Sequence, residues 1–264
     1  MTRRRLDAEL VRRGLAVSRA AAKEMVEEGH VRVAGSVAAR PATMVTPDVA
    51  IDLTGDDVRP FVSRAGGKLA AALDRFAIDP TGWMCLDAGA STGGFTDALL
   101  QRGANHVIAV DVGYGQLAWS IRTDERVTVL ERTNVRDLTP GELPFAPDLV
   151  VADLSFISLT RVLPALTDLA APEATFVVLV KPQFEAGRGD VGSGGVVRDP
   201  AVWHRVIEEV IAAAGSRGLG ARAVMASPLR GPAGNVEFLL QLGPGAEAGA
   251  DVAAAVRDAM AWSA

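Results

Sequence analysis

Seven short apolar runs that alternate with helical stretches constrain the fold of this chain more than any other feature. Each run is only a few residues long, as buried strands are. The runs cover residues 84–86, 107–110, 127–130, 149–152, 176–180, 221–226 and 236–242. The alternation predicts an α/β fold with a parallel, doubly wound sheet and helices on both faces. A Pro- and Gly-rich turn between the last two runs predicts that these two strands form an antiparallel hairpin.

Three helices around these strands have recognisable sequence signals. Residues 67–76 place apolar side chains on one helix face directly before the first strand. Asp199-Pro200 is typical of a helix start, with Asp as the cap and Pro in the first turn. Residues 251–262, after the last strand, also have a helix-like pattern.

The first 60 residues follow a different pattern, that of two short helices and a small sheet. Apolar spacing predicts a first helix that Gly14 ends and a second helix that Ser18 caps. Residues 31–37 alternate around a tight turn and predict a β-hairpin, and residues 48–52 add a candidate strand. The chain therefore begins with a small α+β unit that is distinct from the sheet that follows.

The composition excludes several classes of protein. The chain has 264 residues, of which 49% are apolar and 22% charged, which favours one or two folded domains. No apolar run approaches the roughly 20 residues of a membrane span, and no signal peptide follows the basic start. We therefore expect a cytoplasmic protein without a membrane partner. Its one cysteine, Cys85, and three histidines do not suffice for a cysteine or histidine metal site, so we expect no metal.

Positive charge is concentrated in the first 40 residues. They hold nine Lys or Arg and five acids, a balance of +4, whereas the whole chain carries −5 and the remainder therefore −9. Such a basic unit suits phosphate contacts. The alternative is a solvated helix face with ion pairs, as Arg19, Lys23 and Glu27 are at helical spacing. The candidate RNA-binding residues are Arg3, Arg4, Arg5, Arg12, Arg13, Arg19, Lys23 and, farther along the chain, Arg188.

A glycine-rich turn follows the first predicted strand, where ligands bind in sheets of this kind. Its Gly-x-x-x-Gly-Gly spacing lacks the dinucleotide-binding fingerprint. Asp87 would repel a pyrophosphate there but would favour the amine and sulfonium of S-adenosylmethionine. Asp111 ends the second strand, where a carboxylate can accept hydrogen bonds from ribose hydroxyls. The alternative is that the glycines only allow close packing. The candidate cofactor-binding residues are Asp87, Gly89, Ser91, Thr92, Gly93, Gly94, Phe95, Asp111 and Val112.

The residues after the fourth strand bear on which atom receives a methyl group. Transfer to an exocyclic nitrogen commonly uses an Asn/Asp-Pro-Pro-aromatic turn, whereas this chain has Asp153-Leu154-Ser155-Phe156. Transfer to a pyrimidine carbon needs a cysteine nucleophile, and Cys85 lies within an apolar strand, where an inert packed thiol is expected. Both reactions are therefore disfavoured.

Four charged residues are expected at one edge of the sheet, namely Lys68, Asp153, Lys181 and Glu237. A ribose 2′-hydroxyl is a poor nucleophile until its proton is removed or its oxygen is oriented. Lys181 suits that task if burial and the like charge of Lys68 favour its neutral amine. Asp153 and Glu237 would then fix the lysine's position and share its proton. For each residue taken alone, a structural ion pair is the alternative.

Six segments of the chain closely resemble the TlyA family, which consists of ribosomal RNA 2′-O-methyltransferases that are also called haemolysins. They are residues 63–69, 85–96, 111–117, 153–159, 181–185 and 234–237. Residues 6–35 resemble the small RNA-binding domain named after a small-subunit ribosomal protein. The resemblance implies an FtsJ-like catalytic domain that uses S-adenosylmethionine, with a Lys-Asp-Lys-Glu tetrad at Lys68, Asp153, Lys181 and Glu237. Family members methylate cytidine riboses in the large subunit alone or in both subunits, and the basic start and helix-like tail resemble the two-subunit form.

Together these patterns predict an RNA-binding domain at residues 1–58, a linker at 59–63 and a methyltransferase domain at 64–264. The linker has Arg59-Pro60-Phe61 where a family member has Arg-Ala-Trp. Because proline fixes φ and removes an NH, a linker that signals RNA binding to the cofactor site by changing shape would work differently here.

Three other functions remain as alternatives. They are a nicotinamide oxidoreductase, a membrane-active haemolysin and an RNA-binding protein without catalysis. The missing fingerprint, the absence of an apolar span and the filled tetrad positions weigh against them in turn. The Gly-rich residues 187–195 are expected to be mobile and to order over a flipped-out nucleotide, with an ordinary surface loop as the alternative.

Overall fold

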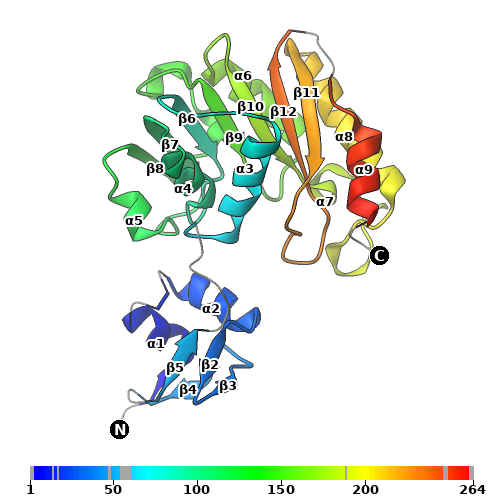
Figure 1. Cartoon of the computed structure of the whole chain (residues 1–264). Coiled ribbons are helices and arrows are strands. Elements are labelled where there is room, and N and C mark those ends of the chain that lie inside the picture. The colour runs from blue at the N-terminus through cyan, green and yellow to red at the C-terminus, as the bar shows by residue number, and fades with distance from the viewer. Residues whose placement is uncertain are drawn as a thin grey trace. The chain divides into compact units, whose positions relative to one another are not determined.

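The computed structural model describes residues 3–13, 15–16, 18–46, 49–53, 61–187, 189–245 and 249–261. It divides the chain into two compact units, residues 1–63 and 64–264 (Figure 1). The predictions for Gly14, Arg59, Pro60 and Arg188 lie outside the described residues. The linker at 59–63 and its signalling role therefore stay predictions.

Among its described residues, the N-terminal unit has two helices and two small sheets. Helix α1 is Leu6–Arg12 and α2 is Arg19–Glu27. The Ser18 hydroxyl accepts a hydrogen bond from the Ala21 backbone NH at 3.1 Å, which confirms the predicted cap of α2. Leu6 and Leu10 of α1 are fully buried, because the apolar stripe of this helix faces the small core of the unit.

The predicted hairpin of the N-terminal unit is confirmed, but the candidate strand is shorter than expected. Strands β2 (Val31–Val33) and β3 (Ser36–Val37) pair antiparallel, and β5 (Ile51–Leu53) pairs with the other edge of β2. The prediction began this strand at residue 48, which lies outside the described residues, and the described residues Val49 and Ala50 precede the strand. A second sheet, β1 (Arg4–Arg5) with β4 (Met44–Val45), was not predicted, since two-residue strands show no alternation.

The second unit contains the predicted doubly wound sheet. Its strands follow the order β11-β12-β10-β9-β6-β7-β8, and the pairs among β10, β9, β6, β7 and β8 are parallel. Strand β12 is antiparallel to both neighbours, which confirms the predicted hairpin. The strand order reverses between β6 and β9, where ligands bind in such sheets. The strands are β6 (Met84–Ala88), β7 (His106–Asp111), β8 (Val127–Glu131), β9 (Leu149–Ala152), β10 (Thr175–Val180), β11 (Leu219–Ala226) and β12 (Phe238–Pro244).

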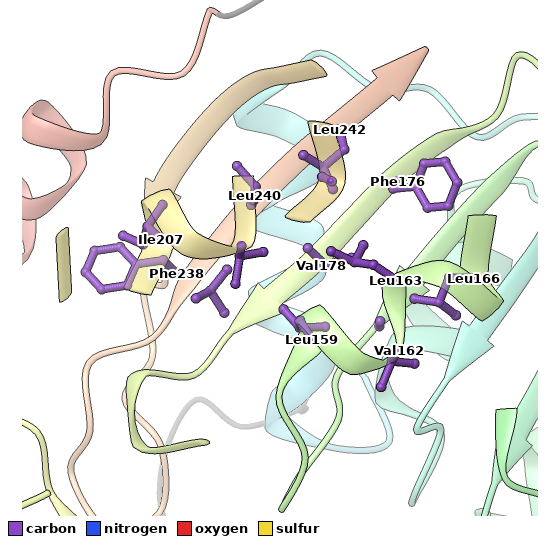
Figure 2. Close-up of a cluster of buried hydrophobic side chains, with 14 of the residues drawn as sticks. Leu159, Val162, Leu163, Leu166, Phe176, Val178, Ile207, Phe238, Leu240 and Leu242 are labelled. Carbon is purple, nitrogen blue, oxygen red and sulfur yellow. The ribbon is translucent and has the colours of Figure 1, made fainter. Parts of the chain in front are cut away.

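Helices cover both faces of this sheet, with α3 and α4 on one face and α6 and α8 on the other (Figure 1). On the α6 and α8 side, buried Leu, Val, Ile and Phe side chains interdigitate with those of β10 and β12 (Figure 2). This packing fixes the strands whose ends carry the candidate site. The helices are α3 (Arg64–Arg75), α4 (Gly94–Gln101), α5 (Trp119–Arg122), α6 (Leu163–Leu169), α7 (Pro182–Glu185), α8 (Pro200–Gly215) and α9 (Val252–Ala261).

All three helices with sequence signals are present. Helix α8 starts at Pro200, and the Asp199 carboxylate accepts a hydrogen bond from the Ala201 NH at 2.8 Å. Helix α3 starts at Arg64, earlier than predicted, and α9 occupies most of residues 251–262. Among the described residues, no helix has the length and apolar character that a membrane crossing requires.

Candidate active site

The carboxyl ends of the parallel strands bring four of the predicted residues to one edge of the sheet. Asp111 ends β7, Asp153 directly follows β9, and Lys181 directly follows β10. Glu237 immediately precedes β12, and because β12 is antiparallel, its start lies at the same edge. The fifth residue, Lys68, comes from α3 on one face of the sheet.

The predicted tetrad forms two ion pairs. Lys181 Nζ lies 2.6 Å from Asp153 Oδ1, and it donates a hydrogen bond of 3.1 Å to the Ser155 hydroxyl. Lys68 Nζ lies 2.5 Å from Glu237 Oε2. Both lysines and Glu237 are buried. Because a buried charge is costly without a partner, each lysine is held in place by its carboxylate.

A glutamine close to Lys181 in the chain contacts the second ion pair. The side-chain NH2 of Gln183, in α7, donates a hydrogen bond of 3.4 Å to Glu237 Oε1, and α7 begins directly after Lys181. Gln183 lies within the segment 181–185, but nothing in the sequence pattern predicts this contact. The structure pairs Lys68 with Glu237, and the effect of Lys68 on Lys181 as a like-charged neighbour stays a prediction. Partner choice of this kind depends on side-chain packing and not on sequence spacing.

Asp87 is buried under the glycine-rich turn and caps the helix that follows it. Its carboxylate is fully buried, and Oδ2 accepts hydrogen bonds from the Thr96 NH at 2.9 Å and the Thr96 hydroxyl at 2.7 Å. Gly93, at the N-cap of α4, has no side chain for capping, so Asp87 caps the helix instead. Burial, augmented by the charge of Asp153 and opposed by the Thr96 bonds, raises the pKa of Asp87 to about 7.

Two glycines of the turn are required by close contacts. Gly89 has a φ of +88°, and a Cβ on it would lie 2.6 Å from the Asp153 carbonyl oxygen. Gly93 has a φ of +95°, and a Cβ there would lie 2.9 Å from the Leu117 side chain. Gly89 thereby holds the turn against the backbone of Asp153, which places the predicted cofactor loop and the Lys181 pair side by side.

A cavity of about 480 Å³ opens beside this turn. It extends from Asp111 to Asp153 and Phe156. Of the predicted cofactor-binding residues, Gly89, Ser91, Asp111 and Val112 line it. The remaining five are not among its lining residues, so direct contacts from them to a cofactor stay predictions; they are Asp87, Thr92, Gly93, Gly94 and Phe95.

Asp111 is anchored at the cavity by two backbone groups. Its Oδ2 accepts a hydrogen bond from the Ser91 NH at 2.7 Å, and its Oδ1 accepts one from the Gly113 NH at 2.6 Å. Each carboxylate oxygen keeps a second lone pair. The carboxylate is therefore fixed in direction and can still accept hydrogen bonds from the hydroxyls of a ligand.

An exposed aromatic side chain, Phe156, borders the same cavity. It is 91% exposed, has a φ of +65°, and its ring centroid lies 5.1 Å from that of Phe184. Glu185 fixes the segment that follows Phe156. Its carboxylate accepts hydrogen bonds from the Ser158 hydroxyl at 2.5 Å and from the Leu159 NH at 2.8 Å. The sequence contained these residues in a motif, but exposure of an aromatic ring cannot be read from spacing.

In the N-terminal unit, two buried acids each hold two of the predicted RNA-binding arginines. Asp7 Oδ2 lies 2.8 Å from Arg5 Nη2 and 3.1 Å from Arg19 Nη2. Glu9 Oε1 lies 2.6 Å from an Arg12 nitrogen and 2.9 Å from an Arg13 nitrogen. The hydrogen bond from Arg5 is the largest cause that lowers the pKa of Asp7, to about 2. The hydrogen bond from Arg12 is the largest cause that lowers the pKa of Glu9, also to about 2.

The other predicted RNA-binding residues differ in their surroundings. Lys23 Nζ lies 3.7 Å from Glu27 Oε1. This is the ion pair expected if the helix face is only a solvated surface and does not bind RNA. Arg3 and Arg4 are exposed. RNA contacts by all of these residues stay predictions.

The comparisons with known proteins bear on both units. Residues 61–244 match the FtsJ-like methyltransferase model and residues 4–51 match the S4 domain. The chain is 57% identical over 240 residues to the 16S/23S rRNA (cytidine-2′-O)-methyltransferase TlyA of Mycobacterium tuberculosis, covering 91% of this chain and 90% of that protein. The chain belongs to the TlyA family of FtsJ-like methyltransferases. The 23S rRNA (cytidine-2′-O)-methyltransferase TlyA of Campylobacter jejuni is 34% identical over 74% of each chain.

Solved structures agree with this membership. A hemolysin-named protein of Streptococcus thermophilus is 37% identical, with a TM-score of 0.79 over 99% of this chain and 97% of its own. A second hemolysin-named structure, from Lactococcus lactis, is 42% identical with a TM-score of 0.74, covering 76% of this TlyA-family chain and 99% of its own. An S-adenosylmethionine-dependent methyltransferase of Listeria monocytogenes, at 17% identity and a TM-score of 0.52, shares the fold.

Proposed function

We propose that this protein transfers a methyl group from S-adenosylmethionine to the ribose 2′-hydroxyl of cytidines in ribosomal RNA, in the cytoplasm and in both ribosomal subunits. One observation carries the proposal: Lys181, paired with Asp153 at 2.6 Å, lies at the edge of the sheet where the 480 Å³ cavity opens. The relative from Mycobacterium tuberculosis, named for cytidine 2′-O-methylation of both RNAs, supports this choice of substrate.

The cavity fits the proposed cofactor. Asp111 offers free lone pairs to ribose hydroxyls, and the tight turn at Gly89 leaves its backbone close to the ligand space. The volume of 480 Å³ lies within the range of small-molecule sites. When bound, S-adenosylmethionine would supply an electrophilic methyl group on a sulfonium. Asp87 would support binding indirectly, because it fixes the start of α4 through Thr96.

In this proposal, Lys181 orients and deprotonates the ribose hydroxyl. Asp153 and Ser155 fix the direction of its Nζ; the Lys181 side chain is buried, and Asp153 lines the cavity. Lys181 can accept the hydroxyl proton only after it has lost its own, because the ammonium that pairs with Asp153 can only orient the hydroxyl oxygen. The Asp153 carboxylate then stabilises the ammonium that forms again. The Lys68–Glu237 pair, which Gln183 contacts through Glu237 Oε1, would help to hold the same edge of the sheet in place.

Phe156 is placed to receive the base of the target nucleotide. Its exposed ring borders the cavity, and single-stranded RNA bases that leave their stack commonly pack on aromatic side chains. The basic residues of the N-terminal unit would bind RNA phosphates and fix the register, while carrying little sequence information.

The direct test is to determine 2′-O-methylated positions in ribosomal RNA from cells with and without this protein. We expect cytidine 2′-O-methylation in both subunit RNAs, and we expect it to be lost when the gene is deleted. Expression of the parent protein should restore the methylation, whereas expression of Lys181→Ala should not. An identical methylation pattern in the presence and absence of the protein would contradict the proposed function.

A further inference from the structure

A second hollow lies at the same edge of the sheet, outside the cofactor cavity. It has a volume of about 400 Å³ and is lined by two arginines, Arg198 and Arg230, above an apolar floor that includes Trp203, Val197 and Val236. We call it the hairpin groove, because the β11–β12 loop forms one wall and the segment before α8 forms the other. Figure 1 shows these two segments, orange and yellow, at the same edge of the sheet.

Buried hydrogen bonds hold the two walls together. Asn235, which is 2% exposed, accepts a hydrogen bond from the Val197 NH at 3.0 Å and donates one to the Gly195 carbonyl at 2.9 Å. Trp203 is 4% exposed, and its indole NH donates to the Val197 carbonyl at 2.9 Å. Because Asn235, Val197 and Trp203 are buried, these bonds give the groove a fixed shape before any ligand binds.

The groove adjoins the catalytic edge directly. Val236 lines the groove and its chain neighbour Glu237 belongs to the tetrad. A Cβ on Gly231, next to Arg230 in the loop, would lie 2.6 Å from Glu237 Oε1, so the backbone of this loop packs against the tetrad carboxylate. A chain of nucleotides whose ribose reaches Lys181 would therefore pass close to the groove.

The charge of the groove suits a phosphodiester. Both arginine side chains are exposed, and Arg198 forms no ion pair within the part of the chain that the structure describes. They stand in a portion of the chain, after residue 40, whose net charge is −9. Arginine binds phosphate through a planar fork of donors, and the apolar floor can pack against a sugar or base.

We propose that the hairpin groove binds the RNA strand beside the methylated nucleotide, with Arg198 and Arg230 on a phosphate. This proposal rests on the proposed function. The groove would add affinity and register for the RNA at the methyltransferase unit, independently of the basic N-terminal unit.

The test compares Arg198→Gln, Arg230→Gln and their double variant with Arg217→Gln in the full-length protein. Arg217 precedes β11 and pairs with Asp168, at the opposite edge of the sheet, and so controls for the loss of one positive charge. We expect each groove variant to weaken binding of purified ribosomal subunits by about 3- to 10-fold, with the salt slope reduced by about one for each lost contact, and Arg217→Gln to match the parent. Unchanged affinity in the double variant, or an equal loss in Arg217→Gln, would overturn the proposal.

A second variant fills the groove without removing an arginine. Ala233 lines the groove and is exposed, so Ala233→Glu should weaken subunit binding whereas Ala233→Ser should not. Equal affinities of these two variants would also overturn the proposal. Failure of the proposed function is distinguishable, because it would appear as a parent protein that binds subunits but transfers no methyl group.

Discussion

Asp87 is a carboxylate that the protein buries completely and uses to start a helix. Its Oδ2 is satisfied by Thr96, whereas Oδ1 has no hydrogen-bond partner within the described residues. An arrangement of this kind disfavours the charged carboxylate, which explains why its pKa is raised to about 7. The same residue that shapes the cofactor turn therefore makes the turn sensitive to pH.

This sensitivity predicts a pH-dependent stability. The unfolded carboxyl ionises near its ordinary pKa of 3.8, whereas the folded one stays protonated up to about 7, so the contribution of Asp87 to stability is greatest at acidic pH and falls as the pH rises through this window. Denaturant unfolding of the parent and Asp87→Asn at several pH values should show the parent losing a few kcal/mol relative to the variant between about pH 4 and 7, since each pKa unit corresponds to about 1.4 kcal/mol. A constant difference across this window would show that Asp87 does not titrate there.

Among elements, the strands of the large sheet could be predicted and the smallest elements could not. Buried parallel strands are near-continuous apolar runs and can therefore be recognised in the sequence. Residues 149–152 coincide with β9, and each of the other predicted runs begins and ends within two residues of the ends of its strand. The two-residue strands β1 and β4 carry no such signal. Topology also placed the tetrad at one edge, but the pairing of Lys68 with Glu237 depends on rotamers that only packing fixes.

Helix α1 illustrates a second limit of prediction from the sequence. Charged residues in a helix give no sign in the sequence that they will be buried. Asp7 and Glu9 are buried in α1, although acids are among the residues most often exposed. Each stabilises two arginines in fixed positions, which makes the helix an organiser of the predicted RNA-binding surface.

The hydrogen bonds that Glu9 accepts from Arg12 and Arg13 predict an acid-sensitive helix, because they lower the pKa of Glu9. Its folded pKa of about 2 lies below the ordinary value of 4.5, so its stabilising contribution is fully present above pH 4.5 and is lost as the pH falls towards 2. Hydrogen exchange of α1 amides should be faster in Glu9→Gln than in the parent near neutral pH, and the two should converge in strong acid. Glu27→Gln, which removes an exposed partner of Lys23, is the matched control and should leave α1 exchange unchanged. Equal protection of α1 in the parent and Glu9→Gln at pH 7 would count against this role.

At the scale of the whole molecule, we propose that binding and chemistry use different groups of residues. The N-terminal unit holds an array of arginines on buried acids, and the hairpin groove adds two more at the catalytic edge. The cavity beside Asp111 is suited to the cofactor, and the Lys181–Asp153 pair lies next to it. A change confined to Lys181 should therefore separate the rate of methyl transfer from the affinities for both substrates.

The measurement that tests this account most directly is the single-turnover rate of 2′-O-methylation of ribosomal subunits by the parent, Lys181→Ala and Lys181→Arg. We predict a rate about 10²- to 10⁴-fold lower in Lys181→Ala, with affinities for S-adenosylmethionine and for subunits close to those of the parent. Lys181→Arg should not recover the rate, because a guanidinium stays protonated and cannot accept the hydroxyl proton. A Lys181→Ala protein that methylates subunits at the parent rate would contradict the account and leave Lys181 a structural partner of Asp153.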